Sequence, residues 1–352
     1  MDRMITVEQS ISSPSLLEAS AARFKIACVV PAYNEERFIA GVIRSVPEFV
    51  DHIIVVNDAS KDGTAEVVGK LTDPRVILVN HETNRGVGGA MVTGYRKALE
   101  IGADVAVKLD GDGQMDPRDM RRLIAPILRG EADYAKGVRF RDSDVLRDMP
   151  LVRLIGNLGL SFMTKIASGY WNIFDPTNGY TALGRMGLKH LKYERLNRGF
   201  FFETSMLIAL YRIDAVVADV PMKARYGNEK SKLIPARIFF SFPVYLLNAL
   251  VQRIVWRYFI RDFTAVSAFL VSGSLLFGFG FTFGLYHWLT SGARGTPAGT
   301  VMLAAVPLIM GFELLLQAIY HSPFPIAVLA KGRSFGAGVD IVCACSDRIA
   351  AP

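Results

Sequence analysis

The 352-residue sequence is poor in cysteine and contains no signal-peptide pattern, low-complexity segment or internal repeat. Three cysteines, Cys28, Cys343 and Cys345, are too few and too scattered for a disulfide framework, and the Cys-Ala-Cys tail lacks the partners of a zinc site. Residues 1–23 contain no continuous apolar run, so no signal peptide is predicted there. These absences argue against a disulfide-stabilised secreted domain and against a repeat architecture.

Acidic, basic and histidine side chains nearly disappear towards the C-terminus. Among acidic, basic and histidine side chains, residues 263–293 have only His287, and residues 295–324 have only Glu313 and His321. A bilayer core needs roughly 20 apolar residues per helix, and each stretch supplies them. We therefore predict transmembrane helices at about 264–289 and 299–320. The alternative is a buried helical hairpin of a soluble domain.

The net charge of +7 could indicate a nucleic-acid partner, but the distribution of the charge favours a membrane surface instead. The basic residues that flank the two apolar stretches are Arg225, Lys230, Lys232, Arg237, Arg253, Arg257, Arg261, Lys331 and Arg333. The loop between the stretches has a single arginine. By the positive-inside rule both termini are predicted to be cytoplasmic, which favours free thiols. No nucleic-acid partner is expected.

Two further segments are amphipathic. In residues 237–262 the spacing of Arg253, Arg257 and Arg261 places one basic face on a helix, and we expect this face to rest against lipid headgroups. The aromatic side chains expected at headgroup depth are Trp256, Tyr258 and Phe259. Residues 149–169 either cover the core or contact the membrane. Glu313 is expected to be protonated or paired with a neighbouring chain, and a homo-oligomer formed through the spans is compatible with the sequence.

Apolar strands alternate with helices in the first two thirds of the chain. Continuous apolar runs predict strands at 25–33, 51–58, 76–80 and 104–110, with helical spacing between them. Such strands indicate a parallel sheet covered by helices on both faces. Ligands of these sheets bind beyond the carboxyl ends of the strands. The segments found there are PAYNEE, NDASKDGT, HETNRGVGG and DGDGQ.

The most specific of these segments begins at Asp110 and ends at Gln114. It places two carboxylates, those of Asp110 and Asp112, one residue apart, and they repel each other unless a positive charge lies nearby. Carboxylate and amide oxygens are the ligands that Mg²⁺ and Mn²⁺ prefer. The alternative is a solvated turn. The glycines of NRGVGGAMVTG are a weak dinucleotide pattern, which we interpret as a helix N-terminus approached closely by a ligand or by a neighbouring loop.

Taken together and in this order, VPAYNE, NDASKDGT, NRGVGGA and DGDGQ resemble the nucleotide-sugar half of family 2 inverting glycosyltransferases. The segments DPTNGYTAL (175–183), FFFETSMLIAL (200–210) and RYGNEKSKL (225–233) narrow this resemblance to the dolichyl-phosphate mannosyltransferase and polyprenyl-phosphate glycosyltransferase branch. The resemblance implies an α/β fold with a GT-A, Rossmann-like domain, followed by interfacial helices and a two-helix transmembrane hairpin.

The resemblance also implies a division of the chain. We expect a flexible tail at 1–23, a GT-A domain at 24–235, juxtamembrane amphipathic helices at 236–262, two transmembrane helices at 263–322 and a cytoplasmic tail at 323–352. The matched motifs cover about residues 24–235, whereas the spans match in architecture only.

Site roles follow from the resemblance position by position. The implied nucleotide-sugar-binding residues are Pro31, Ala32, Tyr33, Glu35, Val56, Asp58, Asp110 and Gly111. The implied metal ligands are Asp110, Asp112 and Gln114, and the implied catalytic set is Asp110, Asp112, Arg139, Arg225 and Lys232. The acceptor phosphate is expected at Thr177, Asn178, Gly179 and Arg225. This chain departs from the family at Asn57, where aspartate is common, and in GNEKSKL, whose extra residue leaves Lys230 and Lys232 as alternatives.

The chemistry points to a lipid-phosphate acceptor. A leaving nucleoside diphosphate is stabilised by a divalent cation and basic groups, and a phosphate monoester is already largely anionic at neutral pH, so no general base is needed. The sequence thus predicts inverting transfer of a hexose from a UDP- or GDP-linked sugar to polyprenyl phosphate at the cytoplasmic face. One alternative is a processive polysaccharide synthase, although QRIVW (252–256) does not match its Q-x-x-R-W signature. The other is a non-enzymatic nucleotide-sugar-binding membrane subunit.

Overall fold

The computed structural model describes residues 24–138, 151–171, 173–176, 178–199, 201–222, 235–291 and 295–320, with the backbone alone for 151–158, 235–241 and 243. Some of the predicted site residues lie outside the described residues, as do the two predicted tails at 1–23 and 323–352. These site residues are Arg139, Thr177, Arg225, Lys230 and Lys232.

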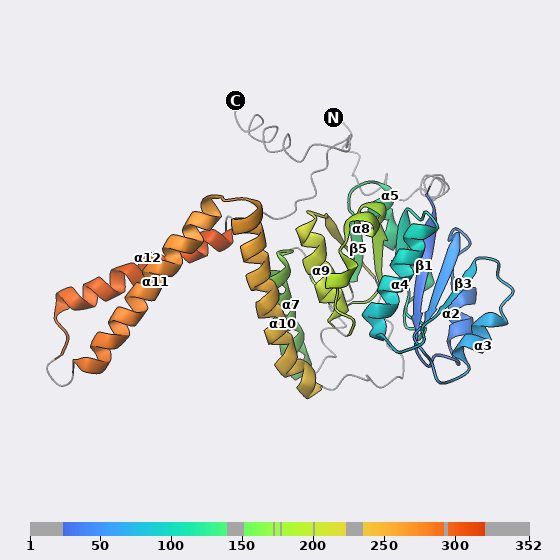
Figure 1. The fold of residues 1–352 in the computed structure, drawn as a ribbon, viewed down its shortest axis with the longest axis horizontal. Coiled ribbons are helices and arrows are strands. Elements are labelled where there is room, and N and C mark those ends of the chain that lie inside the picture. The colour runs from blue at the N-terminus through green and yellow to red at the C-terminus, as the bar shows by residue number, and fades with distance from the viewer. Residues whose placement is uncertain are drawn as a thin grey trace, which may run out of the picture.

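A seven-stranded mixed sheet forms the first part of the chain (Figure 1). The strands are β1 (Ile26–Ala32), β2 (His52–Asn57), β3 (Val76–Asn80), β4 (Val105–Lys108), β5 (Tyr134–Val138), β6 (Thr181–Gly184) and β7 (Val217–Pro221). They lie in the order β3-β2-β1-β4-β6-β5-β7. The four predicted strands pair in parallel, as expected. Strand β6 runs antiparallel to both β4 and β5, which makes the sheet mixed.

Helices cover both faces of the sheet. The helices of this part are α2 (Ile39–Ser45), α3 (Thr64–Gly69), α4 (Gly86–Glu100), η1 (Pro117–Asp119), α5 (Met120–Leu128), α7 (Leu151–Ser168), α8 (Arg185–His190), η2 (Tyr193–Arg195) and α9 (Phe202–Arg212). Alternate residues of β1 point to opposite faces, so that Ala27 and Val29 pack with α4, α8 and α9. Ile26, Cys28 and Val30 pack instead with α2, α3 and α5.

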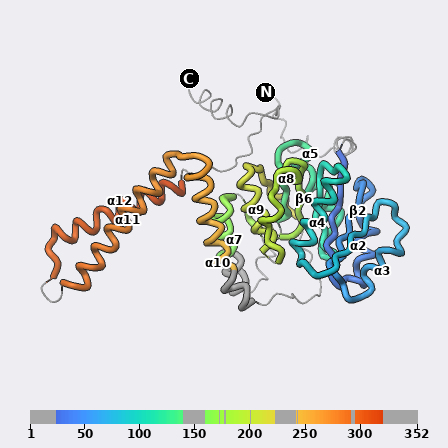
Figure 2. The backbone as a smooth tube through the Cα atoms, viewed as in Figure 1, coloured from blue at the N-terminus to red at the C-terminus, as the bar shows by residue number. Residues whose placement is uncertain are grey.

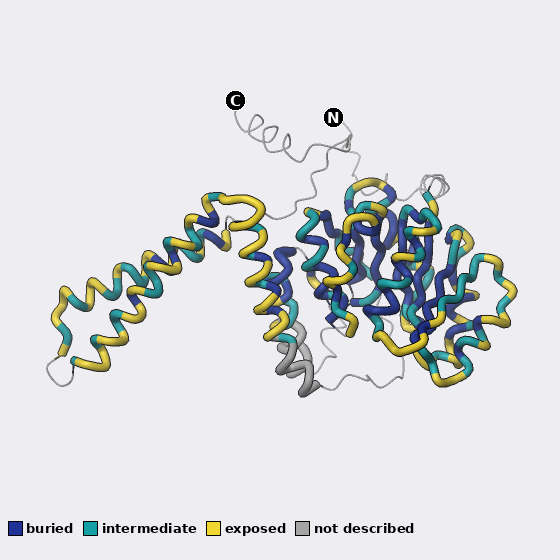
Figure 3. The backbone as a smooth tube through the Cα atoms, viewed as in Figure 1, coloured by how far each residue is buried: buried dark blue, intermediate teal, exposed yellow. Residues whose placement is uncertain are grey.

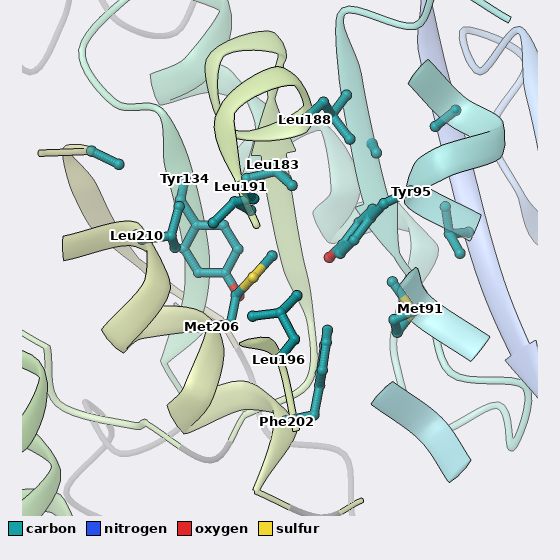
Figure 4. Packing of buried hydrophobic residues seen from close by; sticks show 14 of the residues in the cluster. Met91, Tyr95, Tyr134, Leu183, Leu188, Leu191, Leu196, Phe202, Met206 and Leu210 are labelled. Carbon is teal, nitrogen blue, oxygen red and sulfur yellow. The ribbon is translucent and has the colours of Figure 1, made fainter. Parts of the chain in front are cut away.

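The larger apolar layers are fully enclosed, and the buried positions concentrate in the sheet (Figure 3). Figure 4 shows Met91 and Tyr95 of α4 on one side of a cluster that Tyr134 of β5 and Met206 of α9 complete. On the other face Cys28 is a buried free thiol, and burial raises its pKa to about 12. This thiol is therefore a core side chain and not a reactive group.

The C-terminal part is a helical hairpin that extends away from the sheet (Figure 2). It consists of α11 (Ala265–Thr290) and α12 (Ala298–Tyr320), which are long and apolar enough to cross a membrane. Glycines let the two backbones approach closely: a Cβ on Gly280 would lie 2.6 Å from Leu308 N, and one on Gly311 would lie 2.3 Å from Phe277 N. Most of their other apolar side chains are exposed, unlike those of a buried core hairpin.

Helix α10 (Pro235–Val255) and the π-helix η3 (Trp256–Arg261) connect the two parts. Their basic face does exist, and its arginines contact the end of α9; a contact of this face with lipid headgroups stays a prediction. Arg257 and Arg261 bind the carboxylate of Asp214, at 2.8 Å and 2.6 Å. Arg253 is buried, with its guanidinium carbon 5.3 Å from the ring centroid of Tyr211. The arginines face the end of α9 because α10 packs there.

The exposed positions of the same helices are mainly apolar, although Asn248, Gln252 and Arg261 are exposed too. The large exposed apolar side chains are Val244, Tyr245, Leu247, Val251, Val255, Trp256, Phe259 and Ile260. Tyr258, which was expected at headgroup depth, is buried between η3 and the hairpin helices. Helix α7 covers the core, one of the two roles considered for it, because Thr164 and Ala167 are buried in the protein. Phe162 and Met163 are exposed, and a membrane contact of α7 stays a prediction.

Candidate functional site

Two of the predicted loops meet beyond the carboxyl ends of β1 and β4. A Cβ on Gly111 would lie 3.2 Å from Pro31 O and 3.6 Å from Glu35 Cγ. The turn that follows β4 therefore packs directly against the loop that follows β1. At this contact Ala32 is buried, whereas Tyr33 is exposed.

The loop after β1 is also locked to the loop after β2. The Asn34 backbone, at φ 58°, donates its N–H to Ser60 Oγ at 3.0 Å, and Asn34 Oδ1 accepts the Lys61 N–H at 2.8 Å. The Glu35 N–H donates to Thr64 Oγ1 at 2.9 Å. These bonds join PAYNEE to NDASKDGT, and the packing of Gly111 adds DGDGQ at the same edge of the sheet. The sequence analysis expected this convergence.

Asp58 is almost fully buried and forms a network that the sequence analysis missed. Its Oδ1 accepts the Nδ1–H of His81 at 2.7 Å and the Arg85 N–H at 2.8 Å. His81 Nε2 in turn lies 2.8 Å from Thr93 Oγ1. The network ties the ends of β2 and β3 to α4. In the sequence, the only indication of the pairing between His81 and Asp58 is that His81 follows directly after a predicted strand. The predicted contact of Asp58 and the buried Val56 with a nucleotide base stays a prediction.

The glycines at the start of α4 serve close packing against a neighbouring loop, one of the two alternatives expected for them. Gly86 has φ 75°, a conformation that favours glycine. A Cβ on Gly88 would lie 2.1 Å from Asn197 O, and the Gly88 N–H donates to Arg198 O at 2.9 Å. The loop at 197–199 therefore occupies the space in front of this helix N-terminus.

A positive charge does lie beside the carboxylates of DGDGQ, and it belongs to Lys108. Lys108 Nζ is 2.9 Å from Asp110 Oδ1 and 3.1 Å from Oε1 of Glu203, the second residue of α9. Burial lowers the pKa of the lysine, but the two carboxylates outweigh that effect and raise it above its usual value. The ammonium therefore stays charged. Sequence analysis did not single out Lys108 or Glu203, which lie 95 residues apart.

The rest of the turn contains a bond between a side chain and the backbone. Asp112 Oδ1 accepts the Gln114 N–H at 3.0 Å, Gly113 has φ 76°, and the Gln114 side chain is exposed. Within the described ranges, no group of three or more histidine, cysteine or acidic side chains could hold a metal ion. Mg²⁺ is usually bound by one or two carboxylates together with substrate phosphates. The all-oxygen set of Asp110, Asp112 and Gln114 fits that kind of site, because Asp110 Oδ2 has no hydrogen bond from a described residue.

The segment predicted to bind the acceptor adjoins this turn. A Cβ on Gly179 would lie 2.5 Å from Lys108 Nζ and 3.0 Å from Asp110 Oδ2. The Asn178 side chain is used internally: Nδ2 donates to Gly137 O at 2.7 Å, and Oδ1 accepts the Tyr180 N–H at 3.0 Å. Asn178 therefore shapes the segment with its side chain and leaves Gly179 against Asp110.

A second buried lysine, Lys136, bonds to the backbone of the segment that contains Asn178 and Gly179. Lys136 Nζ of β5 donates to Asn178 O, and its register partner on β7 is Asp219. Burial lowers the pKa of Lys136 to about 8, against the opposing effect of Asp175. Burial raises the pKa of Asp219 to about 6. The segment predicted to bind the acceptor therefore packs on a set of buried charges.

Comparisons with known proteins agree with this arrangement. A family model described as Glycosyl transferase family 2 matches residues 27–192. The UDP-N-acetylglucosamine--dolichyl-phosphate N-acetylglucosaminyltransferase of Methanococcus voltae is 34% identical over 232 residues, which are 62% of this chain and 92% of that protein. The undecaprenyl-phosphate mannosyltransferase of Micrococcus luteus is 30% identical over 205 residues, 56% of this chain and 82% of that protein.

The fold has a solved counterpart. Glucosyl-3-phosphoglycerate synthase of Mycobacterium tuberculosis, crystallised with Mn²⁺, UDP-glucose and phosphoglyceric acid, matches with a TM-score of 0.50 at 23% identity. The match covers 68% of this chain and 83% of that one. The mixed sheet with polar loops at its strand ends therefore defines a GT-A-type glycosyltransferase fold. The chain belongs to glycosyltransferase family 2.

Proposed function

We propose that this protein transfers a hexose from a UDP- or GDP-linked sugar to polyprenyl phosphate, with inversion and with the help of Mg²⁺ or Mn²⁺. The observation that carries the proposal is the contact of Gly179 with Asp110. Gly179, which we assign to the acceptor side, lies directly against the carboxylate turn, and this turn packs on the loop at Pro31 and Glu35. Donor and acceptor elements are therefore contiguous. The acceptor class is supported by the activities that the names of both relatives state.

The residues have separate tasks in the proposed reaction. A phosphate oxygen of the acceptor forms a bond to the anomeric carbon while the bond from that carbon to the donor diphosphate breaks. A bound divalent cation supplies charge stabilisation to the leaving diphosphate, and Asp110, Asp112 and Gln114 would hold it. Lys108 binds Asp110 Oδ1, and Asp110 Oδ2 lies towards Gly179.

The donor would lie over the loop after β1, with Tyr33 and Glu35 towards the sugar nucleotide. We assign the phosphates to Arg139, Arg225 and Lys232 on the strength of the family resemblance alone. The acceptor monoester is already anionic near neutral pH, so positioning replaces deprotonation.

The proposed enzyme is anchored in a membrane. Helices α11 and α12 would span the bilayer, and the apolar side of α10 and η3 would rest on its surface, because these faces are apolar and exposed. The excess of basic residues before α11, compared with the loop that follows it, supports a cytoplasmic catalytic domain. The proposed division is a GT-A domain at 24–235, juxtamembrane helices at 236–262 and spans at 263–322.

The test is a donor screen with purified full-length protein in detergent. Radiolabelled UDP-glucose, UDP-N-acetylhexosamine, UDP-uronic acid and GDP-mannose are each incubated with polyprenyl phosphate and Mn²⁺, and label in the lipid phase is counted. We expect one donor to label the lipid, and polyprenol without its phosphate to stay unlabelled. Equal labelling of polyprenol and polyprenyl phosphate would contradict the assigned acceptor. No label from any donor would contradict the transferase itself.

A further inference from the structure

Three charged side chains, those of Lys108, Asp110 and Glu203, form a group at the carboxyl end of β4. The proposed transfer reaction uses Asp110 as a metal ligand and gives Glu203 no role. Lys108 Nζ is shared between Asp110 Oδ1, at 2.9 Å, and Glu203 Oε1, at 3.1 Å. The exposed fraction of the side chain falls from 30% for Asp110 to 14% for Glu203 and 3% for Lys108. Glu203 is thus an interior partner that reaches Asp110 only through the lysine.

We propose that Lys108 and Glu203 are positioning residues that set the affinity of the Asp110–Asp112 turn for its divalent cation. Lys108 is an internal cation that competes with the metal for Asp110. Glu203 balances part of the positive charge of Lys108, so more of the negative charge of Asp110 remains available to attract the metal. This inference rests on the proposed role of Asp110 and Asp112 as metal ligands.

The geometry supports a competition and not a simple structural ion pair. The lysine engages one oxygen of Asp110, and Oδ2 points towards Gly179. Glu203 restrains the lysine at Oδ1, because it holds the ammonium by a second bond and is more buried than Asp110. Without Glu203, the ammonium of Lys108 would no longer share its charge between two carboxylates, and it would neutralise Asp110 more fully.

The backbone at Gly179 packs against the same group of charges. A Cβ on Gly179 would lie 2.5 Å from the ammonium, so only glycine leaves room for the lysine at this place. The neighbouring Lys136 does not substitute for it, because Lys136 Nζ donates to Asn178 O on β5's side of the segment. Among the described residues, Lys108 is the cation paired with Asp110 and Glu203 is the second carboxylate that shares it, so substitutions at these two positions alter the charge next to Asp110.

The two substitutions are expected to act in opposite directions. Glu203→Gln keeps the size of the side chain and removes a negative charge, so Mn²⁺ should bind about tenfold more weakly or worse. Lys108→Met removes the competing cation, so Mn²⁺ should bind about tenfold more tightly. The measurement is a titration of purified full-length protein with Mn²⁺ alone, in which free Mn²⁺ is followed by its electron paramagnetic resonance signal.

A matched ion pair serves as control. Lys97 and Glu100 lie 2.8 Å apart at the far end of α4, so Lys97→Met and Glu100→Gln should leave Mn²⁺ affinity unchanged. If the two test variants shift the affinity in the same direction, or not at all, while the wild type binds Mn²⁺, the inference is wrong. A wild type that binds no Mn²⁺ would refute the proposed metal role itself. If Lys108→Met does not fold, the isosteric Glu203→Gln decides alone: unchanged Mn²⁺ affinity would overturn the inference.

Discussion

Replacing Gly179 by alanine would force the acceptor segment into the charged group beneath it. The new Cβ would lie 2.5 Å from Lys108 Nζ and 3.3 Å from Met115 Cε, so the ammonium has to move. Its bonds to Asp110 and Glu203, at 2.9 Å and 3.1 Å, oppose that movement. Overpacking costs about 1–3 kcal/mol, and a hydrogen bond to a charged group contributes about 1.5–3 kcal/mol.

We therefore expect Gly179→Ala to lower the free energy of unfolding by about 2 kcal/mol. For a domain of this size that corresponds to a fall in Tm of about 4–8 °C. The rate of transfer to polyprenyl phosphate should fall at least about tenfold, because Asp110 loses its orientation. Calorimetry and the lipid-labelling assay measure the two effects.

Gly41 provides the matched control for this substitution. It is exposed on α2, and a Cβ there would meet no atom within 4 Å, so Gly41→Ala should leave transfer unchanged and raise stability by up to about 1 kcal/mol. If Gly179→Ala retained wild-type Tm and transfer, the close packing of Gly179 on Lys108 and Asp110 would play no part in the site.

Two other substitutions test the supporting structure. Burial raises the pKa of Asp219 from 3.8 to about 6, so the folded state keeps the proton of this carboxyl at a higher pH than the unfolded chain does. The free energy of unfolding should therefore fall by about 3 kcal/mol as the pH rises from about 4 to 6. Asp219→Asn should remove this pH dependence in urea unfolding at several pH values, and an unchanged pH dependence would refute the assignment. Gly88→Ala would place a Cβ 2.1 Å from Asn197 O, so it should lower Tm by several degrees. Loss of nucleotide binding at an unchanged Tm would show instead that a ligand occupies that place.

The strands and their loops could be predicted because they depend on local patterns. The four apolar runs became β1 to β4, since the sheet is covered on both faces: Val29 is buried on one face and Val30 on the other. Parallel pairing then places PAYNEE, NDASKDGT and DGDGQ at one edge. The two apolar helices at the C-terminus followed directly from composition.

The pairs that complete the site depend on tertiary contacts between distant residues. His81 meets Asp58 across 23 residues only because β2 and β3 are neighbours, and no motif marks the histidine. Glu203 reaches Lys108 because α9 packs over the sheet near β4. Such contacts require the relative placement of elements, which periodicity does not supply.

The contacts of the basic face at α10 also depend on tertiary structure. The spacing of Arg253, Arg257 and Arg261 predicted one basic face, and this face exists, but spacing does not reveal what it contacts. Asp214 lies in the turn after α9 with φ 53°, and its carboxylate meets two of the arginines. A basic face and a nearby acid on another element are indistinguishable in sequence from a face that meets anionic lipid.

The central claim is that the carboxylates of the turn after β4 hold a cation that the transfer requires, and Asp112→Asn tests it most directly. The substitution preserves an oxygen that can accept the Gln114 N–H, bonded at 3.0 Å in the structure, so the fold should survive with an unchanged or slightly higher Tm without metal. Transfer of label to polyprenyl phosphate, measured with Mn²⁺ and with a chelator, should fall about a hundredfold or more, at about 1.4 kcal/mol per tenfold. Near-wild-type transfer by the variant, or full activity of the wild type in chelator, would contradict the account.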